Sequence, residues 1–98
     1  MVKLHFKTTE EFEVLFKSKK RNVTDAIVDG IQQAMMNRKK IAQLFEITFE
    51  EEETMFDISL PRAEWQQALS ASLEHYHELE ADDECIDTWK LLEAVKVL

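Results

Sequence analysis

Residues 44–61 read LFEITFEEEETMFDISLP, and they carry the clearest structural pattern in the chain. Apolar side chains alternate with polar ones in two short runs: Phe45, Ile47 and Phe49, then Phe56, Ile58 and Leu60. A period of two is typical of β-strands, so the stretch predicts an antiparallel hairpin with its turn at residues 51–54. Full burial of one such side chain contributes about 1.5 to 3 kcal/mol, whereas ordering one residue's backbone costs about 1 to 2 kcal/mol. The hairpin therefore needs helices or further strands over its apolar face.

Two helices are predicted before the hairpin. Residues 8–11 (TTEE) offer a capping box for the first helix, and the cationic run 17–21 closes it. Asn22 or Thr24 is expected to cap a second helix that runs to about Lys40. The inward stripe of this second helix is predicted as Ile27, Ile31, Ala34 and Met35, continued by Ile41. Gly30 shares the face of Ala34 and costs about 1 kcal/mol relative to Ala in mid-helix, so we expect another element to pack closely there.

Two more helices are predicted after the hairpin. Pro61 is suited to the first turn of a third helix, and Asp82 or Asp83 is suited to cap a fourth. The buried stripe of the third helix is predicted as Trp65, Ala68, Leu69, Ser72, Leu73, Tyr76 and Leu79. The apolar residues of the fourth are Cys85, Ile86, Trp89, Leu91, Leu92, Val95 and Leu98. They spread over more than half the circumference, which indicates a helix that is enclosed on several sides or meets a partner.

Together these elements predict an α+β fold in which about four helices pack on a central antiparallel hairpin. The alternating run at residues 2–6 can add a short N-terminal edge strand. A chain of 98 residues buries only about 60 to 65 % of its unfolded surface, so we expect one core and a single domain over residues 1–98.

Charge divides along the chain. Residues 1–40 hold nine Lys/Arg against five Asp/Glu, a net of +4, and residues 41–98 hold three against fifteen, a net of −12. Cys85 is the single cysteine, and the N-terminus MVKLHFKTTE lacks the apolar run of a signal peptide. No apolar stretch approaches the roughly 20 residues that cross a bilayer. We therefore expect a cytoplasmic protein that does not enter the membrane.

The residue types that usually carry catalysis do not converge in this sequence. His75 and His77 point about 160° apart on a helix that turns about 100° per residue, so they cannot share one metal ion. Glu74 and His77 form one E-x-x-H pair, whereas di-iron bundles need two. Cys85 has the spacing of a core residue, and a chain with one glycine excludes the G-x-G-x-x-G and P-loop motifs. We expect no enzyme, no metal and no cofactor.

Direct nucleic-acid binding is not expected either. The basic clusters at residues 17–21 and 38–40 lie at opposite ends of the second predicted helix, roughly 25 Å apart. A net charge of −8 opposes approach to a phosphate backbone. The acidic runs 50–53 and 82–84 instead allow a regulator that imitates DNA and occupies a DNA-binding protein, and this alternative stays open.

Partner binding is the remaining class. Exposed methionines, the wide apolar face of the fourth helix and open hairpin edges predict docking of another protein or of a second copy, with a homodimer favoured. The predicted contact residues are Met35, Met36, Leu91, Val95, Leu98, Glu51, Glu52 and Glu53.

The hairpin LFEITFEEEETMFDISLP, the W-x-x-A-L and LEHY segments after it, and the ending IDTWKLLEAVKVL resemble small uncharacterised accessory proteins of T4-like phages that infect marine cyanobacteria. The resemblance covers roughly residues 44–98. It implies an accessory protein in the cytoplasm of an infected bacterium, and it transfers no site residues.

Overall fold

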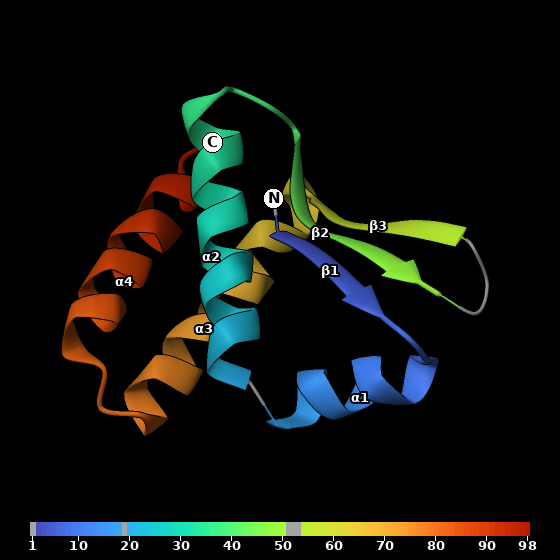
Figure 1. The fold of residues 1–98 in the computed structure, drawn as a ribbon. Coiled ribbons are helices and arrows are strands. Elements are labelled where there is room, and N and C mark those ends of the chain that lie inside the picture. The colour runs from blue at the N-terminus through green and yellow to red at the C-terminus, as the bar shows by residue number, and fades with distance from the viewer. Residues whose placement is uncertain (1, 19, 51–53) are drawn as a thin grey trace.

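The computed structural model describes residues 2–18, 20–50 and 54–98, and it confirms the predicted α+β class with four helices (Figure 1). The elements follow the predicted order along the chain. They are β1 (Val2–Phe6), α1 (Thr9–Ser18), α2 (Lys20–Met36), β2 (Ile41–Phe49), β3 (Thr54–Pro61), the short 3-10 helix η1 (Arg62–Glu64), α3 (Trp65–Glu78) and α4 (Asp82–Lys96).

The predicted hairpin is only part of a mixed, three-stranded sheet with the order β1-β2-β3. β3 pairs antiparallel with β2, as predicted, but β1 pairs parallel with residues 45–49 on the other side of β2. Parallel neighbours require a crossover connection, and α1 and α2 supply it. The N-terminal strand is thus present at an edge, and the central element of the sheet is β2 rather than the hairpin.

A β-bulge interrupts the alternation of β2. Gln43 lies opposite Ser59 and Phe45 lies opposite Ile58, which leaves Leu44 as the extra residue. Leu44 and Phe45 are adjacent and yet both buried, with 5 % and 4 % of their surface exposed. A bulge permits this because it puts two residues of one strand opposite one of its partner. The strand therefore continues back to Ile41, which was predicted to extend the stripe of a helix and is instead an exposed strand residue.

Phenylalanines join α1 to one face of the sheet. The ring of Phe12 lies 5.6 Å from that of Phe6 and 5.9 Å from that of Phe49, both edge-to-face. Phe16 meets Phe45 at 5.5 Å, also edge-to-face. This is the favoured geometry for aromatic pairs. The apolar face predicted for the hairpin is thus covered by a helix from the N-terminal half of the chain.

Polar side chains occupy the other face of the sheet. Nζ of Lys3 lies 3.8 Å from a carboxylate oxygen of Glu46, its neighbour across the strands. Nδ1 of His5 lies 2.8 Å from the hydroxyl of Thr48, again its direct neighbour. This face is suited to water, since opposite charges and hydrogen-bonding groups pair across β1 and β2.

α2 packs on the sheet at Gly30. A Cβ built on Gly30 would lie 2.6 Å from Cδ2 of Leu44 and 3.2 Å from the carbonyl oxygen of Gln43. The close packing predicted at this glycine is confirmed, and β2 is the element that approaches. Ile31 and Ala34 are buried, which confirms the centre of the predicted stripe.

The cap predicted for α1 is confirmed, because the Glu11 N–H donates to the Thr8 hydroxyl at 3.3 Å, just before α1 begins at Thr9. The caps predicted for the other three helices differ from the observed ones. α2 begins at Lys20, so Asn22 and Thr24 lie within it, and the Thr24 hydroxyl donates to the carbonyl of Lys20 at 2.8 Å instead of capping. Pro61 ends β3 and precedes η1 rather than opening α3. Ala81 occupies the N-cap position of α4, with no side-chain cap, so the predicted cap at Asp82 or Asp83 was wrong. The acidic first turn of α4 still favours its dipole.

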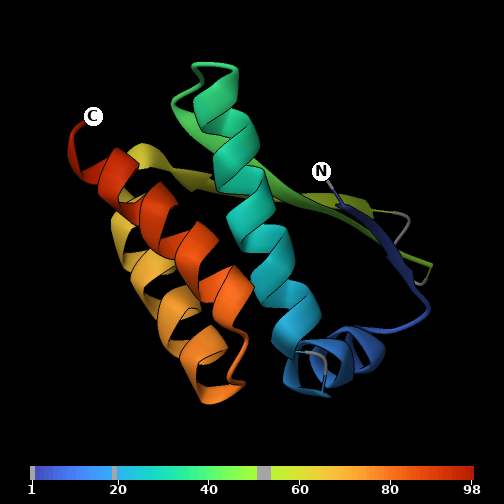
Figure 2. The same ribbon diagram turned by 90° about the vertical axis from the view of Figure 1, so that its left-hand side faces the viewer.

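α3 and α4 form an antiparallel pair beside α2 (Figure 2). Trp65 fixes the start of α3, because its ring is fully buried and its Nε1 donates to the carbonyl of Leu60 at 2.8 Å. From α4, Leu92 and Val95 join the core. Among the described residues, no helix combines the length and apolarity that crossing a bilayer requires.

Candidate partner-binding surface

The outer side of the α3–α4 pair exposes large apolar side chains. Ile86 and Trp89 of α4 are 52 % and 53 % exposed. They line a hollow of about 360 Å³. The residues around this hollow, defined here as the α3–α4 surface, are Leu73, His77, Cys85, Ile86, Trp89 and Lys90. Trp is one of the residue types that are enriched at protein-binding hot spots.

Helical spacing explains why these side chains remain outside. Thr88, Leu92 and Val95 follow at intervals of four and three residues and form the buried stripe of α4. Ile86 and Trp89 fall off this stripe, so packing α4 against the rest of the chain leaves them exposed. The wide apolar arc predicted for this helix is therefore covered only in part.

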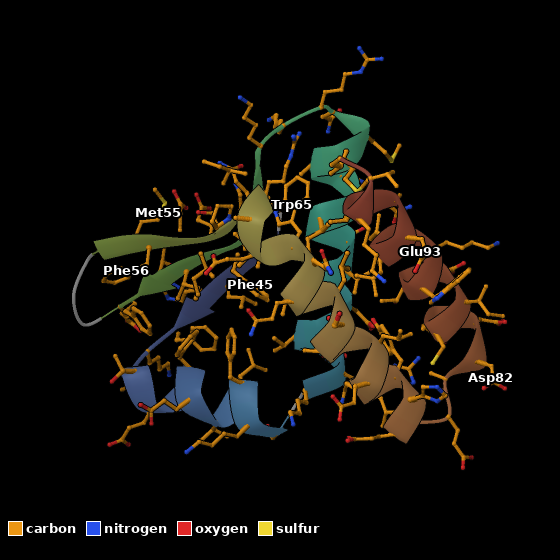
Figure 3. The ribbon with its side chains drawn as sticks, turned by 180° about the vertical axis from the view of Figure 1, so that it is seen from behind. Phe45, Met55, Phe56, Trp65, Asp82 and Glu93 are labelled. Atoms are coloured by element: carbon orange, nitrogen blue, oxygen red, sulfur yellow. The ribbon has the colours of Figure 1, made fainter. Side chains whose placement is uncertain are left out.

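The segment that forms α3 and α4 is acidic as a whole. From Trp65 to Leu98 the chain holds eight Asp/Glu against two Lys, a net of −6. Acidic residues fill the first turn of α4 at Asp82, Asp83 and Glu84 (Figure 3 labels Asp82). Among the described residues, the hollow itself is lined by Lys90 and by no carboxylate, so attraction to a basic partner comes from acidic residues elsewhere on the two helices.

None of the contact residues predicted from the sequence that the structure describes lines this hollow. Met36 and Leu98 are exposed, at 70 % and 58 %. Met35 and Leu91 are half-buried and pack against the core. Val95 is itself in the core at 8 % exposure, because it continues the inward stripe of α4, and it therefore drops out of the predicted set. Glu51, Glu52 and Glu53 lie outside the described residues.

Sequence reasoning did not single out Leu73, Ile86 and Trp89 as contact residues. Leu73 was assigned to the buried stripe of the third helix, and Ile86 and Trp89 were left among the broad apolar arc of the fourth. The signal that could have found them was the breadth of the apolar arc of α4. An arc wider than the stripe that one neighbour can cover leaves its margins exposed.

The two histidines of α3 line different hollows. His77 belongs to the α3–α4 surface, whereas His75 lines a hollow between α2 and α3 with Lys20, Ser72 and Glu74 among its neighbours. This separation agrees with the predicted angle between them. Both ring nitrogens of His75 are buried without a hydrogen-bond partner in the described structure. In the part of the chain that the structure describes, no three His, Cys, Asp or Glu residues are placed to hold a metal ion.

Cys85, a free thiol, lies in the same hollow as His77. The lining of this hollow is otherwise largely apolar. The sequence placed these two residues on different predicted helices, and the fold brings them to one surface.

A third hollow, of about 160 Å³, lies between α2, α3 and α4 and is acidic. Its lining includes Asp25, Val28, Asp29, Gln32, Tyr76, Glu84, Asp87 and Thr88. The Tyr76 hydroxyl donates a hydrogen bond to Asp25. Burial raises the pKa of Tyr76 well above its ordinary value, and the hydrogen bond to Asp25 and the charges of Asp25 and Glu84 raise it further. Arg21 opposes this shift and forms an ion pair with Glu84 at 2.8 Å.

The basic clusters do not form one patch. Lys20 and Arg21 stand in the first turn of α2, and residues 38–40 follow its last residue. The 17 residues of α2 separate them by about 25 Å. This arrangement matches the prediction from helix length.

Comparison with known proteins gives no match: none was found among protein-family models, curated proteins or solved structures.

Proposed function

We propose that this chain is a non-enzymatic accessory protein that binds another protein through the α3–α4 surface. One observation carries the proposal: Trp89 and Ile86 are both more than half exposed beside an apolar hollow. Large exposed apolar patches on small folded chains mark contact sites, and Trp contributes more than most residues to binding energy.

Charge supports one kind of partner. With a net of −6 from Trp65 to Leu98, the surface favours a protein that offers an apolar anchor surrounded by Lys or Arg. From the resemblance to cyanophage accessory proteins, we further propose that this partner is a host or viral protein in the cytoplasm of an infected bacterium.

Affinity capture from such a lysate tests the proposal, with wild type, Trp89→Lys and Val14→Lys compared by mass spectrometry. Val14 is a matched control, because it is also exposed and apolar, at 63 %, but lies on α1. We expect Trp89→Lys to lose at least one protein that wild type and Val14→Lys both retain. An identical set of captured proteins for all three would contradict the proposal.

A second candidate function is competition with DNA for a DNA-binding protein. Four carboxylates, of Asp25, Asp29, Glu84 and Asp87, line the acidic hollow on the side of α2 and α4, and this observation favours it. Salt distinguishes the two candidates. A complex that salt dissociates steeply and duplex DNA displaces supports the DNA imitation, whereas a salt-tolerant complex that Trp89→Lys abolishes supports apolar docking.

A further inference from the structure

β3 is an outer strand whose free side is open. In the sheet order β1-β2-β3, no strand of the described structure pairs with the outer side of β3. Figure 1 shows the strand extending beyond the helices. An outer strand presents unpaired N–H and C=O groups, which can pair with another extended chain.

The side chains of β3 do little to prevent such pairing. Phe56 is 45 % exposed and Met55 is 57 % exposed, and they project from opposite faces of the strand (Figure 3). Asp57 is the one charged residue among the eight of β3, in a chain of which 33 % is charged. Natural edge strands are commonly protected by several charges, by Lys above all. The opposite edge, β1, fits that pattern better, since it is five residues long and exposes Lys3 and His5.

The two ends of the β2–β3 hairpin carry exposed residues of opposite charge. Glu50 lies at the hairpin turn, where Phe49 pairs with Thr54. Lys40 and Arg62 meet at the other end, because the Arg62 N–H donates to the Lys40 carbonyl at 2.9 Å. All three side chains belong to exposed residues. The ends are about 26 Å apart for a strand of eight residues.

Antiparallel pairing of two such strands is self-complementary. It sets the start of each strand beside the end of the other, so the hairpin end that carries Glu50 in one copy lies beside the end that carries Lys40 and Arg62 in the second. Parallel pairing would instead bring like charges together. A two-fold axis perpendicular to the sheet produces this arrangement and keeps the helix-covered faces of both copies on the same side.

We propose that the occupant of the β3 edge is a second copy of this chain, which joins two three-stranded sheets into one antiparallel-paired sheet of six strands. The dimer leaves the α3–α4 surface free, because that surface belongs to other elements. The proposed dimer therefore does not depend on the proposed function. A standard interface buries about 800 Å² per partner. We expect pairing through a single strand of eight residues to bury less, so that the dimer dissociates on dilution.

Light scattering coupled to size exclusion, across a dilution series, tests this dimer. Wild type is expected to show twice the 11.5 kDa mass of the chain at high concentration and to approach the single mass on dilution. Met55→Lys and Phe56→Lys are each expected to remain monomeric, since an edge charge opposes strand pairing. Met55→Lys is needed because Phe56 also packs on Phe49, with ring centroids 5.8 Å apart, and its replacement can disturb the fold.

Trp89→Lys is the matched control and is expected to dimerise like wild type. Circular dichroism verifies that each variant is folded. The proposal is overturned by a wild type that stays monomeric at the highest concentration, or by a folded Met55→Lys variant that still dimerises. Loss of the dimer in Trp89→Lys would also overturn it, because the second copy would then occupy the α3–α4 surface.

Discussion

Tyr76 ties α3 to α2 through its hydrogen bond to Asp25, and this contact makes stability depend on pH. Its pKa in the folded chain lies above the ordinary 10.0, chiefly because the ring is buried. A tyrosine whose pKa is raised by folding stabilises the folded state at pH values below its pKa in the unfolded chain. This contribution is lost as the pH rises from that pKa through the higher pKa of the folded chain. We therefore expect thermal stability to fall as the pH rises above about 10.

Tyr76→Phe isolates this effect in melting curves recorded at pH values on either side of the Tyr pKa. At neutral pH the variant loses about 1 kcal/mol with the hydrogen bond. At high pH its stability should decline less than that of wild type, since Phe cannot ionise, while all lysines titrate equally in both. Parallel declines in the two proteins would show that Tyr76 is not responsible.

His75 presents the opposite case, a polar side chain whose burial costs stability. Both ring nitrogens are buried without a partner in the described structure. An unsatisfied buried polar group costs about 1 to 3 kcal/mol, so His75→Leu should stabilise the fold by about 1 kcal/mol. Urea unfolding measures the change, with the exposed His77→Leu as control, for which we expect less than about 0.5 kcal/mol. A loss of stability in His75→Leu would indicate that the imidazole is hydrogen-bonded after all.

At the scale of elements, Gly30 sets the distance between α2 and β2. Ala ordinarily gains about 1 kcal/mol over Gly within a helix, but overpacking a core costs about 1 to 3 kcal/mol. Leu44, which the new Cβ would meet, is itself buried at 5 % exposure and has little room to move. Gly30→Ala should therefore destabilise the chain by about 1 kcal/mol, measured by urea unfolding.

A double variant checks the cause. If the methyl group that Gly30→Ala introduces clashes with Leu44, shortening the leucine side chain relieves the clash. Gly30→Ala combined with Leu44→Ala then loses less stability than the sum of the two single changes. If the stability losses of the two single variants simply added up in the double variant, the clash would not involve Leu44.

Elements with a strong local pattern were predictable from the sequence. The hairpin followed from the alternation of Phe and Ile, and each of the four predicted helices exists. The bulge at Leu44 was not predictable, because the alternation is read from Phe45 onward and an extra residue before it resembles the end of a helix. The parallel pairing of β1 depends on the crossover through α1 and α2, a contact between distant segments that no local period encodes.

The whole molecule shows why the contact surface was harder to predict than the fold. Trp89 has the apolar character of a core residue, and only the position of α4 against α3 and α2 determines which of its apolar residues stay exposed. Val95 was assigned to the surface for the same reason and is buried. The basic and acidic halves of the chain also meet within the fold, since Arg21 of α2 pairs with Glu84 of α4. Charge counted along the sequence therefore overstated the separation of charge in space.

Quenching of tryptophan fluorescence by acrylamide can detect docking at the α3–α4 surface, because Trp65 is fully buried and Trp89 is 53 % exposed. In the isolated chain, we expect strong quenching in wild type and in Trp65→Phe, and weak quenching in Trp89→Phe. Addition of the protein captured by wild type should then protect Trp89 in the first two and change nothing in the third. Emission from Trp89 that is equally quenched with and without that protein would contradict docking at the α3–α4 surface.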